Sequence, residues 1–126
     1  MSGGRARVLV VDDDPFVRRL IELTLRGVGG VEITQACDGA EAVASARDHP
    51  PSLVLLDVEM PRVDGIEACR QLRALEGDLG EHARIVMLTA AGPGVEAAAR
   101  RAGADAFLGK PFSPLALLEL VERAAA

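Results

Sequence analysis

The feature that most constrains the fold is a run of four apolar residues that ends in an acid, Leu53–Leu56 followed by Asp57. Pro50, Pro51 and Pro61 bound this segment, and its short, uninterrupted apolar character predicts a strand buried on both faces. Such a strand is typical of the middle of a parallel sheet. Because open α/β sheets bind ligands at the carboxyl ends of their strands, Asp57 is expected to lie at a functional site.

Four more segments have the pattern of strands, and a helical pattern follows each of the five. The other strands are expected over residues 8–11, 31–34, 85–88 and 104–108. This alternation predicts an α/β fold with a doubly wound five-stranded parallel sheet. The second strand is half polar and suits an edge, which favours the flavodoxin-like strand order 2-1-3-4-5.

Apolar stripes predict which face of each helix packs on the sheet. The residues expected to face inward in the first and last helices are Phe16, Leu20 and Leu23, with Val17, Ile21 and Val28 beside them, and Leu115, Leu118 and Val121. The helix after Gly94 offers mainly alanine to the sheet, so it is expected to be the most loosely held. Asp14 and Ser113 are predicted to cap the first and last helices.

Length and charge limit the classes of protein to which the chain can belong. Its 126 residues fit one domain, expected over residues 7–126, behind a mobile tail of residues 1–6. A net charge of −5 argues against direct nucleic-acid binding by this domain. No apolar run approaches the roughly 18 residues that cross a membrane, so no membrane contact and a cytoplasmic location are expected. Cys37 and Cys69 are expected to be reduced thiols packed as small hydrophobic side chains.

Polar side chains follow four of the predicted strands at what becomes one edge of the sheet, namely Asp12, Asp13, Asp57, Thr89 and Lys110. Three carboxylates at close range repel one another unless a cation compensates them. Oxygen ligands with room for water suit Mg²⁺, or Mn²⁺ in its place. The edge of the sheet is therefore a predicted magnesium site.

A metal held by acids attracts a phosphoryl group. Lys110 could neutralise one phosphoryl oxygen, and the Thr89 hydroxyl could donate a hydrogen bond to another. Asp57 is then a plausible nucleophile that attacks phosphorus and forms an acyl phosphate. No obvious base is present to expel the product quickly, so the site is expected to hold a phosphoryl group for a time.

Five motifs in order resemble the receiver domain of two-component response regulators, the CheY-like family of bacterial signalling. They are Val10-Val11-Asp12-Asp13, Leu55-Leu56-Asp57-Val58-Glu59-Met60-Pro61, Asp64-Gly65, Leu88-Thr89-Ala90 and Lys110-Pro111-Phe112. The resemblance covers nearly all of residues 7–126. It implies a phosphorylated signalling domain that assists its own phosphorylation and slow dephosphorylation, and not a turnover enzyme.

The resemblance also implies roles for individual residues. Asp57 would accept phosphate, and Asp13, Asp57 and the backbone carbonyl of Glu59 would ligate Mg²⁺, with Asp12 acting largely through water. Thr89, Ala90 and Lys110 would contact the phosphoryl oxygens, and Lys110-Pro111 would be a cis peptide. Thr89 and Phe107 would form a switch in which the aromatic ring turns inward as Thr89 moves toward the phosphate.

Partners follow from the same resemblance. The phosphodonor would be a sensor histidine kinase, a phosphotransfer protein or a small phosphodonor. The output surface would be the fourth helix, the fifth strand and the last helix, where an output domain or effector protein binds. Homodimer formation on phosphorylation is left open.

The side chain of Glu59 is an additional acid beside the carboxylates of the predicted metal site. It lies at the mouth of the predicted site, where it either deters an attacking water or donor or is merely a solvated acid. In the first case, Glu59→Asn would change the lifetime of phosphorylated Asp57.

Three other functions compete with this interpretation. The Asp12-Asp13-Asp14 run also fits a haloacid-dehalogenase-type phosphatase with Asp12 as the nucleophile, although Asp57 would then have no role. A degenerate receiver that only docks is disfavoured because all five positions are intact. Flavin binding is disfavoured by the acidic mouth and by the absence of Trp and Tyr.

Overall fold

The computed structural model describes residues 6–60, 64–79, 82–90 and 92–125. The expected mobile tail therefore lies outside the described residues, except for Ala6, which begins the first strand. The elements in chain order are β1 (Ala6–Val11), α1 (Pro15–Leu25), β2 (Val31–Ala36), α2 (Gly39–Asp48), β3 (Leu53–Asp57), α3 (Gly65–Leu79), β4 (Arg84–Thr89), α4 (Pro93–Ala102), β5 (Ala106–Gly109) and α5 (Pro114–Ala125).

The five strands form one parallel sheet in the order β2-β1-β3-β4-β5, which confirms the predicted fold class and strand order. Every residue of β3 is buried, as its unbroken apolar sequence predicted. β2 lies at one edge, with Glu32 and Gln35 exposed and Ala36 buried. All strands point the same way, so their carboxyl ends share one edge of the sheet.

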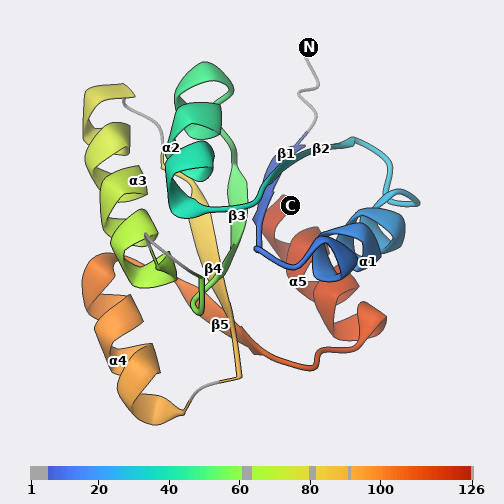
Figure 1. Cartoon of the computed structure of the whole chain (residues 1–126). Helices are drawn as coiled ribbons and strands as arrows, with labels where there is room; N and C mark the ends of the chain where they lie inside the picture. Colours follow the sequence, from blue (N-terminus) through green and yellow to red (C-terminus); the bar gives the residue numbers. More distant parts are fainter. Residues whose placement is uncertain (1–5, 61–63, 80–81, 91, 126) are drawn as a thin grey trace.

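Helices cover both faces of the sheet, with α1 and α5 on one side and α2, α3 and α4 on the other (Figure 1). The sheet thus separates two apolar clusters. Leu9, Val54, Leu56 and Met87 belong to the cluster on the α2–α4 side, and their neighbours along the strands face α1 and α5. This alternation holds the strand ends rigidly between two packed layers. None of the helices in the described part of the chain is long and apolar enough to cross a membrane.

Of the two neighbouring stripes predicted for α1, the one with Val17, Ile21 and Val28 packs against the sheet, and the one with Phe16, Leu20 and Leu23 was wrong. Ile21 and Leu25 are fully buried, whereas Phe16, Leu20 and Leu23 are 74%, 36% and 49% exposed. Apolar residues occupy two neighbouring stripes of this helix, so periodicity by itself does not identify the stripe that meets the sheet. The stripe that packs follows the i, i+4 row of Ile21 and Leu25, and the other stripe faces solvent.

The same error applies to one residue of α5. Leu115 is 66% exposed, while Leu117 and Val121, one turn apart, are buried against the sheet. Cys37 is also exposed, contrary to its predicted packing, whereas Cys69 is buried as predicted.

Both predicted helix caps are present. The Asp14 carboxylate accepts the Phe16 N–H at 2.9 Å, and the Ser113 hydroxyl oxygen accepts the Ala116 N–H at 3.1 Å. At the start of α4, Gly92 provides no side-chain cap. Only Ala99 and Ala102 of α4 are fully buried, so its loose attachment stays a prediction of low local stability.

A partly buried arginine ties α3 to the amino-terminal edge of the sheet. Arg73 donates to the carbonyl oxygens of Ala83 (2.6 Å) and Gly103 (2.8 and 3.0 Å) and to the carboxylates of Glu76 and Asp105 (both 2.7 Å). We call these five residues the Arg73 cluster. The cluster fixes the end of α4 and the start of β5 at the edge opposite the predicted site.

Candidate functional site

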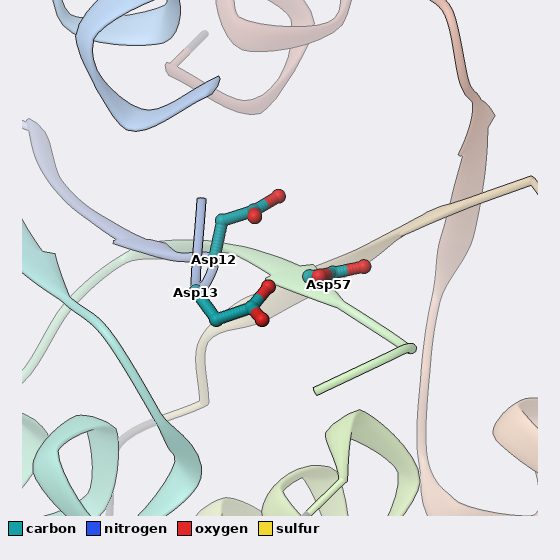
Figure 2. A group of neighbouring side chains, drawn as sticks. All are labelled: Asp12, Asp13 and Asp57. Atoms are coloured by element: carbon teal, nitrogen blue, oxygen red, sulfur yellow. The ribbon is translucent and has the colours of Figure 1, made fainter. Parts of the chain in front are cut away.

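Three carboxylates converge at the carboxyl ends of β1 and β3 (Figure 2). Asp12 and Asp13 directly follow β1, and Asp57 is the last residue of β3. One oxygen from each residue lies within 4.8 Å of one from each of the others. Asp12 and Asp57 are buried and Asp13 is exposed, so the cluster opens to solvent on the Asp13 side.

Lys110, which follows the edge strand β5, lies beside these acids. The Lys110 ammonium lies 2.9 Å from Asp12 Oδ2 and 3.1 Å from Asp57 Oδ1. The residue immediately follows β5, whose end is held to β4 by a hydrogen bond from the Lys110 N–H to the Thr89 carbonyl oxygen (2.9 Å). The Lys110–Pro111 peptide bond is cis.

The site has more negative than positive charge. One ammonium faces three carboxylates, which leaves an excess of acid in a partly buried position. Hard oxygen ligands at this spacing, with one of them open to water, fit a Mg²⁺ ion that keeps part of its hydration shell. The residues that could hold the ion are Asp12, Asp13 and Asp57.

The charge crowding changes the titration of the central acid. Burial, and next the Asp12 carboxylate, raise the pKa of Asp57 from 3.8 to about 6, although Lys110 and the Glu59 N–H act in the opposite direction. Burial acts to lower the pKa of Lys110, but its hydrogen bonds to the two carboxylates outweigh this effect and the pKa is raised. The lysine therefore stays charged while Asp57 is an unusually basic carboxylate.

Asp57→Asn is expected to stabilise the metal-free protein at neutral pH. Because the pKa of Asp57 is higher in the folded than in the unfolded state, its ionisation between roughly pH 4 and 6 disfavours folding. The full cost, about 2–3 kcal/mol, is present at pH 7.5 and shrinks as the pH falls toward 4. Urea unfolding followed by circular dichroism across this range measures the difference between the two proteins.

The matched control is Asp64→Asn, an exposed acid whose capping bond to the Glu67 N–H an asparagine can also make. At pH 7.5 its stability should lie within about 0.5 kcal/mol of that of the parent. The prediction would be contradicted if the parent and Asp57→Asn were equally stable at pH 4.5 and also equally stable at pH 7.5.

Thr89 and Glu59 meet beside this cluster. The Thr89 hydroxyl donates to Glu59 Oε2 at 2.9 Å, and the Glu59 N–H donates to Asp57 Oδ1 at 3.2 Å. Thr89 is buried at the end of β4, whereas Glu59 and Ala90 are exposed. Thr89 and Glu59 were predicted to lie near the site, but their contact was not, because it joins residues 30 positions apart, one at the end of β4 and the other after β3.

Phe107 lies one strand further along the sheet. In β5 it pairs with Met87 of β4, and the Arg100 guanidinium of α4 covers its ring at 4.7 Å from the centroid. The ring is half-buried and packs against the α2–α4 apolar cluster. It is thus placed between the strand that carries Thr89 and the helix predicted to be loosely held.

Sequence analysis missed one residue at the site. Arg18 of α1 donates to the Asp12 carbonyl oxygen at 2.6 Å and to Gln35 Oε1 at 3.2 Å. It thereby fixes the turn that orients Asp12 and Asp13. Arg18 lies four residues after the Asp14 cap, where a surface arginine is equally common. The sequence therefore does not mark it as a residue of the site.

An apolar groove of about 380 Å³ opens beside Lys110. Phe16 and Leu20 of α1 line it, together with Ala90 and Phe112. The exposed stripe of α1 therefore borders the site.

Comparison with known proteins agrees with this geometry. Residues 8–122 match the family described as the response regulator receiver domain. The chain belongs to this family. Its fold is the one that the sequence motifs predicted.

Curated relatives of this receiver domain are longer proteins. The chain is 42% identical over 122 residues to the DNA-binding response regulator MtrA of Mycolicibacterium smegmatis, covering 96% of the chain and 51% of that relative. It is 45% identical over 118 residues to the response regulator MprA of Mycobacterium sp. strain KMS, covering 93% and 48%. The chain therefore spans about half the length of the curated relatives that it matches.

Solved structures show the same fold at nearly full length. The Vibrio cholerae chemotaxis protein CheY4 superimposes with a TM-score of 0.87 at 33% identity, covering 96% of the receiver domain and 99% of CheY4. A putative response regulator from Chloroflexus aurantiacus gives a TM-score of 0.83 at 36% identity, covering 95% and 97%. The phosphatase alternative is not favoured by these similarities.

Proposed function

We propose that residues 7–126 form the phosphoacceptor domain of a two-component response regulator, with Asp57 as the residue that receives the phosphoryl group. The observation that carries this proposal is the contact of Lys110 with both Asp57 and Asp12 at the mouth of an acidic cluster. Oxygens of Asp12, Asp13 and Asp57 lie within 4.8 Å of one another, so these three carboxylates could hold a divalent ion beside the phosphoacceptor. Asp57 is the only one of the three acids that ends the central strand.

The proposed transfer uses one bond exchange. An Asp57 carboxylate oxygen attacks phosphorus, the new P–O bond forms, and the P–N bond of a phosphohistidine breaks as the imidazole nitrogen leaves with the bonding pair. Bound Mg²⁺ supplies charge neutralisation for the phosphoryl oxygens. Lys110 orients the Asp57 carboxylate and then pairs with a phosphoryl oxygen, while the Ala90 N–H and the Thr89 hydroxyl are the proposed donors to the others.

The proposed donor is a sensor histidine kinase or a phosphotransfer protein, which reaches Asp57 across the groove beside Lys110. The proposed output surface is α4, β5 and α5, because Phe107 lies there next to Arg100 of α4. The domain acts as a signalling switch whose phosphorylation is slow to reverse, and not as a turnover enzyme. In a longer regulator, the remainder of the protein is the proposed effector.

The test is to identify the residue that carries phosphate. Incubation with Mg²⁺ and a radiolabelled small phosphodonor is expected to label the protein through a hydroxylamine-sensitive acyl phosphate. Asp57→Asn should abolish the label, and peptide mass spectrometry of the parent should place one phosphoryl group on the peptide that contains Asp57. Omission of Mg²⁺ should also prevent labelling.

Asp12→Asn separates this proposal from the phosphatase alternative. In the proposed mechanism this variant is labelled more slowly on Asp57, since Asp12 only assists the metal. Label that persists in Asp57→Asn and disappears in Asp12→Asn would overturn the proposal and favour the phosphatase.

A further inference from the structure

The hydroxyl of Thr89 is already committed to a strong acceptor. It donates to Glu59 Oε2 at 2.9 Å, and a hydroxyl has a single proton to donate. A hydrogen bond to a carboxylate is roughly twice as strong as one between neutral groups. Thr89 itself is buried, so its side chain has little freedom to satisfy a second acceptor at the same time.

We propose that the Glu59 side chain is a latch that holds the Thr89 hydroxyl away from Asp57 until a phosphoryl group is present. This inference rests on the function proposed above. The phosphoryl oxygens on Asp57 and the Glu59 carboxylate compete for the same Thr89 proton, so Thr89 contacts the phosphoryl group only when the latch opens. Glu59 is a positioning residue in this scheme and does not touch the reacting atoms with its side chain.

The position of Glu59 lets it respond to the state of Asp57. Its N–H donates to Asp57 Oδ1, and Asp57 pairs with Leu88, the residue before Thr89, in the parallel ladder. Charge added to Asp57 also repels the Glu59 carboxylate. Phosphorylation would therefore weaken the latch from both sides, by competition for the proton and by repulsion between like charges.

The first test needs no ligand. In the metal-free parent protein, the Thr89 side chain should favour one rotamer, measured by nuclear magnetic resonance from the couplings to its methyl group. Glu59→Met, which keeps the length of the side chain and removes this acceptor, should change the populations of the Thr89 rotamers. An identical Thr89 rotamer in the parent and in Glu59→Met would overturn the latch.

The second test uses beryllofluoride with saturating Mg²⁺ as a phosphoryl mimic, with binding followed by titration calorimetry. In the parent, the charge-assisted hydrogen bond between Thr89 and Glu59 must break before Thr89 can contact the mimic. Glu59→Met lacks this bond, so it is expected to bind the mimic about tenfold more tightly. Asp14→Asn is the charge control, because it removes an exposed acid near the site whose carboxylate accepts the Phe16 N–H. Its binding should change much less.

A double-mutant cycle separates a latch from simple repulsion at the mouth. Thr89→Val keeps the shape of the side chain and removes its hydroxyl. In this background the latch has nothing to hold, so adding Glu59→Met should leave beryllofluoride affinity unchanged. A gain of tenfold that persists in the Thr89→Val background would overturn the latch and identify Glu59 as a repelling charge only.

Failure of the latch and failure of the proposed function give different results. Parent protein that does not bind beryllofluoride, or Asp57→Asn that binds it equally well, overturns the phosphoacceptor function. Parent protein that binds through Asp57, with Glu59→Met unchanged in affinity, overturns the latch alone.

Discussion

Gly65→Ala is expected to destabilise the protein by about 3 kcal/mol or more, because its new methyl group has no room. A Cβ on Gly65 would lie 2.1 Å from the Asp57 carbonyl oxygen and 2.7 Å from the Val58 Cα. Both neighbours are backbone atoms, and the Gly65 N–H also donates to the Val58 carbonyl oxygen at 3.0 Å. The clash can be relieved only by moving α3 or the backbone that carries Asp57.

Urea unfolding monitored by circular dichroism measures this loss, and weaker Mg²⁺ binding by any folded fraction would report the displaced Asp57. Gly77→Ala is the matched control in the same helix, since nothing lies within 4 Å of its would-be Cβ. That variant should gain about 0.5–1 kcal/mol from the helix preference of alanine. Equal stability of Gly65→Ala and Gly77→Ala would show that α3 is not pressed against β3 as described.

Arg73→Met is expected to cost about 3–5 kcal/mol, because it removes the cation from a partly buried cluster. The change removes the guanidinium that Glu76, Asp105 and the carbonyl oxygens of Ala83 and Gly103 share, and leaves each carboxylate with one backbone N–H donor, from Ala83 and Ile85 respectively. Those acids repel one another and the carbonyl oxygens lose hydrogen bonds. The midpoint of urea unfolding should fall sharply at pH 7.

Arg70→Met provides the control one turn earlier on α3. Arg70 pairs with Glu67 at 3.1 Å, but both side chains are about half exposed, so the ion pair contributes little. Its loss should change stability by no more than about 0.5 kcal/mol. Similar effects of the two substitutions would mean that the Arg73 cluster stabilises the fold no more than a surface ion pair does.

Much of the fold could be predicted because its signals are local. The unbroken apolar sequence of β3 and the half-polar sequence of β2 were enough to order the strands. The faces of α1 and α5 were harder, since each helix has more apolar residues than its buried stripe can use. Phe16 and Leu115 satisfy a helical period as well as Ile21 and Leu117 do, and only the tertiary packing selects between them.

The candidate site likewise has one part that the sequence could predict and another that it could not. Residues at strand ends, such as Asp57 and Lys110, could be predicted to converge because a parallel sheet brings those ends together. The contacts of Arg18 with Asp12 and of Glu59 with Thr89 depend on how loops and long side chains settle. No periodic pattern encodes such contacts, so they were found only from the structure.

The three phenylalanines are the only aromatic residues of the chain, and none of them is buried. Phe16 and Phe112 line the groove beside Lys110, and Phe107 lies under Arg100 on α4. Fluorine introduced on every phenylalanine would consequently give three resonances, with no ring from the interior among them. The resonances of Phe16 and Phe112 would report binding in the groove, and that of Phe107 would report a change at the proposed output surface. One unmutated sample could therefore compare the times at which the two events occur.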